Sequence, residues 1–267
     1  MNWDLVDWSI IGPALCAGLI ILSTHVPLGQ EVLRRGIIFI DLAIAQIAGL
    51  GVIAAYGLHW DEGGFTVQIA AITAALAAAA ILNWTEKRWP KTQEPLIGIF
   101  FILAATGGIL LLAGNPHGSE HLKDLLVGQI LWSTWSSLVP ILGLYVVLLG
   151  LWFGAREKIG GFGFYIIFAI AVTASVQIVG IYLVFASLII PALATVRLNG
   201  NMRLLVAYFL GALAYAIGII VSALIDLPTG AVIVWTLAIF ALIAGLGIPR
   251  LIANPVESMA VNLKADR

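Results

Sequence analysis

The sequence predicts an all-α fold, a polytopic bundle of transmembrane helices with about seven to nine membrane spans. Of its 267 residues, 61% are hydrophobic and only 10% are charged, whereas a soluble domain carries about 25% charged residues. The mean hydropathy is +1.07. Polar residues fall into short islands between apolar runs, and about 20 apolar residues cross a bilayer core. Because no island is long enough for a soluble domain, residues 1–267 are expected to form a single transmembrane domain.

The islands divide the chain into nine predicted spans. They cover residues 10–32, 36–57, 65–83, 97–113, 126–153, 162–178, 180–196, 204–225 and 229–248. The run from 162 to 196 has basic residues at both ends, so the chain either crosses twice there or dips into the membrane and returns. Nine crossings are therefore expected, with seven crossings plus a re-entrant pair as the alternative.

The basic residues predict the orientation of these spans. All Lys and Arg except Lys123 fall at one set of span ends, and basic residues favour the cytoplasmic side. The N-terminus is therefore expected outside and the C-terminus inside, in a multi-pass protein of the inner (cytoplasmic) membrane.

Asp41 is the most informative polar residue inside a predicted span. It lies in LRRGIIFIDLAIAQ, residues 33–46, about a turn and a half past Arg35. Arg34 is seven residues earlier and would share its helical face. An ionised carboxylate at the bilayer centre costs about 2.5–3.5 kcal/mol or more. Asp41 therefore either pairs with an arginine or a neighbouring helix end, or lines a route or gate. Gln46 lies off that face and could hydrogen-bond to a neighbouring helix.

Two further polar residues lie near predicted span ends. His25 precedes Pro27, which disrupts a helix and frees a carbonyl. The histidine either satisfies that helix end or makes a soft metal contact. Asp226 precedes Leu227 and Pro228 at the outer face, where it is expected to cap the last span or to receive a delivery protein.

The outer loop NPHGSEHLKD, residues 115–124, carries His117, Glu120 and His121. Two imidazoles and a carboxylate within five residues could hold Zn²⁺ or Mn²⁺ transiently. Alternatively, the loop is simply solvated. Ser119 has the character of a helix cap, which would leave His117 outside the helix.

Three segments resemble the integral membrane subunits of ABC-type zinc, manganese and iron uptake systems. VLRRGIIFIDLAIAQ is similar to their motif V-L-R-R-x-x-F-F-G-D-A-L-S-H-A, and the positions that match are Arg34, Arg35, Phe39 and Asp41. VGIYLVFASLIIPALATVRL, residues 179–198, resembles V-G-x-L-L-V-x-A-L-L-I-I-P-A-A-T-A, with Pro191 in place. DLPTGAVIVWTLAIFAL, residues 226–242, resembles D-L-P-S-G-x-x-I-V. The Ser-His pair of the first motif is replaced here by Ile44 and Ala45.

The resemblance implies a permease that imports a divalent metal ion (zinc or manganese, or iron) by alternating access. It implies a homodimer or pseudo-dimer, a cytoplasmic ATP-binding cassette subunit and an extracytoplasmic metal-binding protein. The chain has no G-x-x-x-x-G-K-[ST] loop, so ATP hydrolysis is expected on the partner and no enzymatic activity on this chain. Neither a covalently bound cofactor nor a nucleic-acid partner is expected.

The candidate residues fall into three groups. The candidate metal contacts are Asp41, His25, His117, Glu120 and His121. The candidate gate or structural residues are Arg34, Arg35, Gln46, Pro191 and Asp226. The candidate ATPase-coupling residues are Arg156, Glu157 and Lys158, in a loop, GAREKIGG, that is shorter than the family's usual docking segment. That short loop keeps a passive channel or an uncoupled membrane subunit open as the alternative, and an intramembrane enzyme ranks last.

Overall fold

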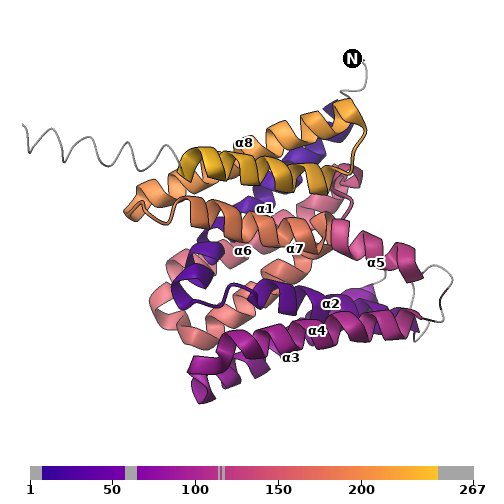
Figure 1. Cartoon of the computed structure of the whole chain (residues 1–267), viewed down its shortest axis with the longest axis vertical. Helices are drawn as coiled ribbons and strands as arrows, with labels where there is room; N and C mark the ends of the chain where they lie inside the picture. Colours follow the sequence, from indigo (N-terminus) through magenta and orange to yellow (C-terminus); the bar gives the residue numbers. More distant parts are fainter. Residues whose placement is uncertain (1–7, 58–64, 114, 116–117, 246–267) are drawn as a thin grey trace, which may run out of the picture.

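The computed structural model describes residues 8–57, 65–113, 115 and 118–245, and this part of the chain is helical without strands (Figure 1). The helices are α1 (Trp8–Arg35), α2 (Ile40–Gly57), α3 (Phe65–Arg88), α4 (Gln93–Leu112), α5 (Gly118–Val127), α6 (Trp135–Gly154), α7 (Arg156–Ala194), α8 (Gly200–Ile225) and a last helix, Thr229–Gly245. Two 3₁₀ turns, η2 (Pro90–Thr92) and η3 (Ile130–Trp132), lie between them. Seven of the described helices are long and apolar enough to cross a membrane, and the last helix is shorter. The predicted all-α transmembrane fold is therefore confirmed.

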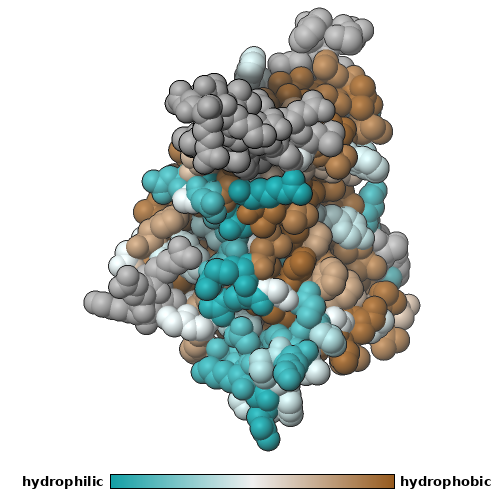
Figure 2. Space-filling view, turned by 60° about the vertical axis from the view of Figure 1, so that its left-hand side comes forward, coloured by the Kyte–Doolittle hydropathy of each residue, from teal (hydrophilic) through white to brown (hydrophobic). Residues whose placement is uncertain are grey.

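The long helices define two ends of the bundle. α1 ends in Arg34 and Arg35, and α3 ends in Lys87 and Arg88; we call this the basic end. Figure 2 brings it forward and shows hydrophilic side chains gathered beside apolar surface. At the opposite end, where α1 begins, α6 also begins with Trp135. That the basic end faces the cytoplasm stays a prediction.

α7 folds back on itself at Gly180. Gly180 has φ 74° and ψ 166°, which is not helical. A Cβ atom on Gly161 would lie 3.9 Å from a terminal guanidinium nitrogen of Arg35, and one on Gly29 would lie 1.9 Å from the Leu188 carbonyl oxygen. Both ends of α7 therefore approach the basic end of α1, which requires the chain to reverse direction in between.

The reversal gives α7 a first limb, residues 161–179, and a second limb, residues 181–194. These limbs agree with the predicted pair of segments at 162–178 and 180–196, which were expected to cross twice or to dip in and return.

The predicted span 126–153 is wrong in its first third. α5 ends at Val127, and α6 begins only at Trp135. The start of α6 is fixed by a capping box, in which the Thr134 hydroxyl oxygen accepts a hydrogen bond from the Ser137 backbone N–H at 3.3 Å. Ser119 does not precede its helix as a cap, because α5 already begins at Gly118.

α1 and α7 form the centre of the bundle. α1 packs against α6, α7 and α8, while α2 packs against α3, α4 and α7. Small residues allow this close approach: a Cβ atom on Gly18 would lie 2.2 Å from the ring of Tyr215. The outward surfaces of the outer helices carry exposed apolar side chains, as contact with lipid requires. Trp84 and Trp89 pack edge to face, 5.2 Å between centroids, at the rim of the basic end, in keeping with an aromatic belt.

Candidate functional site

The end of one helix and the start of the next separate the two arginines from Asp41. α1 ends at Arg35, and Gly36 follows with φ 70°, a left-handed conformation that glycine adopts without strain. α2 then begins at Ile40, so Asp41 is the second residue of a new helix. The expectation that Arg34 and Asp41 share one helical face is therefore wrong.

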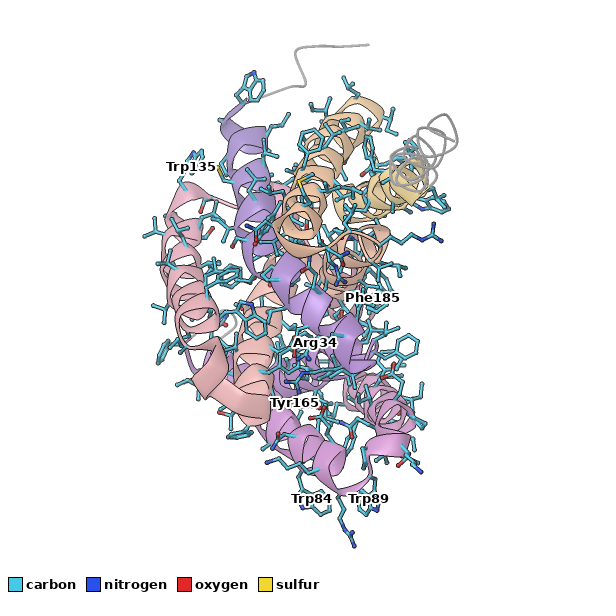
Figure 3. The ribbon with its side chains drawn as sticks, turned by 90° about the vertical axis from the view of Figure 1, so that its left-hand side faces the viewer. Arg34, Trp84, Trp89, Trp135, Tyr165 and Phe185 are labelled. Atoms are coloured by element: carbon cyan, nitrogen blue, oxygen red, sulfur yellow. The ribbon has the colours of Figure 1, made fainter. Side chains whose placement is uncertain are left out.

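Both arginines bind Glu31 instead. Arg34 donates to both carboxylate oxygens of Glu31, and its Nε lies 2.8 Å from Oε2. Arg35 Nε donates to Glu31 Oε1 at 2.9 Å, while its Nη1 lies 3.4 Å from Glu86 Oε1. The Arg35 guanidinium also sits 4.4 Å from the centroid of the Phe164 ring. In Figure 3 Arg34 lies at the basic end of α1.

Neither Arg34 nor Arg35 is therefore the partner of Asp41. Within the described part of the chain, no basic side chain lies within 4.0 Å of its carboxylate, and the predicted pairing is wrong. Asp41 is only 1% exposed, and no side chain donates a hydrogen bond to either of its oxygens. The donors that face it are the backbone N–H groups of Asp41 and Leu42, in the first turn of α2. A helix N-terminus favours an anion there, but it leaves most of the charge uncompensated.

Glu94 brings a second carboxylate to the same place. It lies in the first turn of α4, where Oε1 accepts the backbone N–H of Phe39 at 3.2 Å. Its other oxygen, Oε2, is buried without a partner, and Glu94 repels Asp41 electrostatically. Two carboxylates with unsatisfied oxygens thus lie near the start of α2. No sequence pattern singles out Glu94, because it lies 53 positions after Asp41 and only the folding of α4 against α2 brings the two together.

Gln46 lies in the neighbouring groove rather than beside these carboxylates. The groove, about 620 Å³, runs between α2, α4, α5, the second limb of α7 and the last helix. Its walls are apolar and aromatic, including Phe101, Phe185 and Trp235, and Gln46 is one of few polar side chains that line it. Phe185, labelled in Figure 3, stacks on Phe39 at the edge of the groove, with 6.5 Å between ring centroids. No hydrogen bond from Gln46 to a neighbouring helix is seen among the described residues.

His25 is fully buried in the interior of α1, not at the start of α2. Its Nδ1 is 2.9 Å from the Ile21 carbonyl oxygen, and its Nε2 is buried without a partner. Pro27 does not end the helix, since α1 continues to Arg35. Pro27 does free the carbonyl of Ser23, as expected, and the Tyr208 hydroxyl of α8 donates to that oxygen at 2.8 Å. The metal contact of His25 stays a prediction.

The candidate metal site in the outer loop lies mostly outside the described residues. His117 lies outside the described residues, as does the side chain of His121, while Glu120 is exposed in the first turn of α5. Within the described part of the chain, no group of three His, Cys, Asp or Glu side chains is placed to hold a metal ion. The metal-binding hypothesis for this loop stays a prediction.

The candidate coupling residues lie in the first turn of α7. α6 ends at Gly154 and α7 begins at Arg156, so a single residue, Ala155, separates the two helices. Arg156, Glu157 and Lys158 occupy the first turn of α7, but their side chains lie outside the described part. Their contact with an ATPase stays a prediction.

Pro191 and Asp226 both have structural surroundings. Pro191 lies in the second limb of α7, where the Thr195 hydroxyl donates to its carbonyl oxygen at 2.8 Å. Asp226 ends α8 in a left-handed conformation, φ 53°, and its N–H donates to the Ser222 carbonyl. Asp226 therefore terminates α8 at its C-terminus, and the expectation that it caps the last helix is wrong.

Three glycines lie in close contact with neighbouring backbone. Gly128 follows the end of α5, Gly180 is the reversal point of α7, and Gly230 is in the first turn of the last helix. A Cβ atom on Gly180 would lie 2.3 Å from the Gly128 nitrogen, and one on Gly230 would lie 2.6 Å from the Val127 carbonyl oxygen. Gly128 has φ 68°. We call this contact the glycine junction.

Comparison with known proteins places the chain in a family. A profile of the ABC 3 transport family matches residues 7–160 and 154–247. The manganese transport system membrane protein MntC of Halalkalibacterium halodurans is 25% identical over 252 residues, covering 86% of this chain and 85% of MntC. The manganese import system permease protein ScaB of Streptococcus parasanguinis is 27% identical over 238 residues, 81% of this chain and 82% of ScaB. The high-affinity zinc uptake system membrane protein ZnuB of Haemophilus influenzae is 25% identical, covering 84% of this chain and 92% of ZnuB.

The fold is also found among solved structures. PsaBC from Streptococcus pneumoniae in complex with Fab contains a chain that superposes with a TM-score of 0.73 at 22% identity, covering 91% of this chain and 95% of that one. The family profile spans nearly all of the described helices. This multi-pass membrane protein therefore belongs to the ABC 3 transport family.

Proposed function

We propose that this chain is the membrane-spanning permease of an ABC importer for a divalent metal ion, with manganese as the favoured cargo. Membership of the ABC 3 transport family supports the coupling to ATP hydrolysis on a separate chain. The names of relatives with similar sequences, two for manganese and one for zinc, support the kind of cargo.

The observation that carries the proposal is the pair of carboxylates at the start of α2. Asp41 and Glu94 offer three buried oxygens without hydrogen-bond partners. Burying such charge is costly unless a cation compensates it. The donors are all oxygen atoms, and carboxylates suit Mn²⁺, whereas imidazole and thiolate suit Zn²⁺. Because the family's histidine is Ala45 here, manganese is favoured over zinc.

A second copy of the chain would complete the route. The groove that contains Gln46 is apolar and open, at about 620 Å³, and a route for ions needs polar groups on both sides. Packing two copies on this face would bring Gln46 and the start of α2 of each protomer toward a shared path. The homodimer, the ATPase at the basic end and the delivery protein at the opposite end belong to this proposal.

Uptake of manganese and zinc by cells that contain the whole transporter tests the proposal. Asp41→Asn keeps the shape of the side chain and removes its charge, and we expect manganese uptake to fall by at least about tenfold, as the loss of groups that tune metal sites does. Asp124→Asn, an exposed carboxylate in α5, is the matched control and should transport normally. Wild-type uptake by Asp41→Asn would contradict the role of the carboxylate.

Coupling needs a separate measurement. Uptake should stop when the partner ATPase carries a substitution that abolishes ATP hydrolysis. Continued uptake under that condition would favour the passive channel over the coupled permease.

A further inference from the structure

A small polar groove opens at the basic end between α1, α6 and α8. It has a volume of about 110 Å³. Its lining residues are Pro27, Gln30, Glu31, Arg34, Trp152, Phe153, Arg203 and Leu204. None of these residues lines the larger groove that contains Gln46, so the two grooves lie on different parts of the molecule.

The groove presents hydrogen-bond donors that the protein does not satisfy. Gln30 Nε2 and Arg203 Nε are both buried, and neither has a partner among the described residues. Among the described residues, Glu31 is the only carboxylate in the lining, and Arg34 and Arg35 already bind both of its oxygens. Within the described part of the chain, no carboxylate therefore pairs with Arg203. Unsatisfied buried donors are costly unless a ligand accepts from them. An anion with several acceptor oxygens meets this requirement.

The helices on either side of the groove face lipid. α6 exposes Val147 and Leu151, and α8 exposes Leu205 and Phe209, the last of these 70% exposed. Phe153, which lines the groove, is itself half exposed. Donors at the end of the bundle, with exposed apolar surface running along both neighbouring helices, match a molecule that has an anionic head and apolar tails.

We propose that this groove binds the phosphate group of an anionic phospholipid, with Arg203 and Gln30 as the donors. Its volume accommodates a phosphate group, whereas acyl chains must lie outside, along α6 and α8. Basic pockets between transmembrane helices at the membrane surface recognise lipid headgroups in this way. The bound lipid would hold α1 against both neighbouring helices at the end where the ATPase is proposed to dock. The proposal does not depend on the cargo or on Asp41.

Native mass spectrometry of the full chain in detergent tests this assignment. The protein is titrated with phosphatidylglycerol, with phosphatidylcholine, and with phosphatidylglycerol in the presence of excess inorganic phosphate. We expect tighter binding of phosphatidylglycerol than of phosphatidylcholine, and little competition by inorganic phosphate. Arg203→Gln should weaken phosphatidylglycerol binding about fivefold, the effect of about 1 kcal/mol for one basic side chain near a lipid surface.

Matched variants distinguish lipid binding in the groove from a general effect of positive charge at the basic end. Arg88→Gln removes the same charge from an exposed position at the basic end and should leave binding unchanged. Gln30→Leu removes a donor without changing the charge and should also weaken binding, so the assignment can still be tested if Arg203→Gln does not fold.

Four results would overturn the proposal. The first is equal retention of phosphatidylglycerol by the wild type and both groove variants, and the second is that Arg88→Gln weakens lipid binding as much as Arg203→Gln does. The third is displacement of phosphatidylglycerol by inorganic phosphate. The fourth is that the groove variants lose a co-purifying ATPase while their lipid binding is unchanged. The third result would assign the groove to a free anion, and the fourth would assign it to the ATPase.

Discussion

Replacing Gly180 with alanine should destabilise the protein strongly, because it affects both the backbone and the packing of the glycine junction. The conformation of Gly180, φ 74° and ψ 166°, lies in a region that is essentially restricted to glycine and costs other residues about 1–3 kcal/mol. The new Cβ atom would also lie 2.3 Å from the Gly128 nitrogen and 2.5 Å from the Val127 carbonyl carbon. Backbone atoms cannot move aside as a flexible side chain can, and such overpacking costs about 1–3 kcal/mol more.

Two matched substitutions separate these contributions. Gly160→Ala has a comparable backbone conformation, φ 60° and ψ −169°, but no atom of the described residues lies within 4 Å of the added atom. It should show only the conformational cost. Gly143→Ala lies inside α6 with open space around it and should stabilise the protein by about 0.5–1 kcal/mol, because alanine favours the helix.

Thermal unfolding of the purified chain in detergent, followed by tryptophan fluorescence, measures the order of the variants. One kcal/mol shifts the midpoint by about 2–4 °C in a chain of roughly this size. Gly143→Ala should therefore unfold at the highest temperature, then the wild type, then Gly160→Ala, and Gly180→Ala at the lowest. Equal midpoints for Gly180→Ala and Gly160→Ala would show that the three backbones do not meet as described. A wild-type midpoint for Gly180→Ala would refute the reasoning as a whole.

Two further predictions concern α1 and α2. Tyr208→Phe should cost about 0.6–1.7 kcal/mol of unfolding free energy by removing the hydrogen bond to the Ser23 carbonyl. In a Pro27→Ala background the new backbone N–H can satisfy that carbonyl, so a double-mutant cycle should show the cost shrinking; equal costs in both backgrounds would contradict the role of the freed carbonyl. Ala45→His, one turn after Asp41 on the same face, should raise zinc uptake relative to manganese by supplying an imidazole. Ala48→His, equally buried but one turn farther on, is its control, and equal zinc-to-manganese ratios in the two variants would count against the carboxylate site.

Hydropathy predicted the fold well where a span is a continuous apolar helix. It failed between residues 126 and 134, because Gly128 and the capping box at Thr134 break an apolar run without making it polar. The break is held by contacts with Gly180 and with the start of the last helix. These contacts join segments about 50 and 100 residues apart, and no local sequence pattern predicts them. The reversal at Gly180 could be predicted because basic residues flank both ends of 162–196.

The same contrast explains the candidate site. The sequence identified Asp41 because a carboxylate in an apolar run is unusual, but the nearest arginines were the only compensation that a linear pattern could offer. Gly36 ends the helix before Asp41, and Glu31, a residue that drew no attention in the sequence, binds those arginines. Glu94 then adds a second negative charge, contributed by a different helix. The fold thus removes the expected cations from Asp41 and brings an acidic neighbour to it. Asp41 is buried and Glu94 is half-buried, so their repulsion disfavours close packing at the start of α2 when both are ionised. Under the function proposed above, a divalent cation would compensate both charges. Under the same proposal, the repulsion between these two carboxylates is the physical reason to expect the metal cargo here rather than at the histidines of the outer loop.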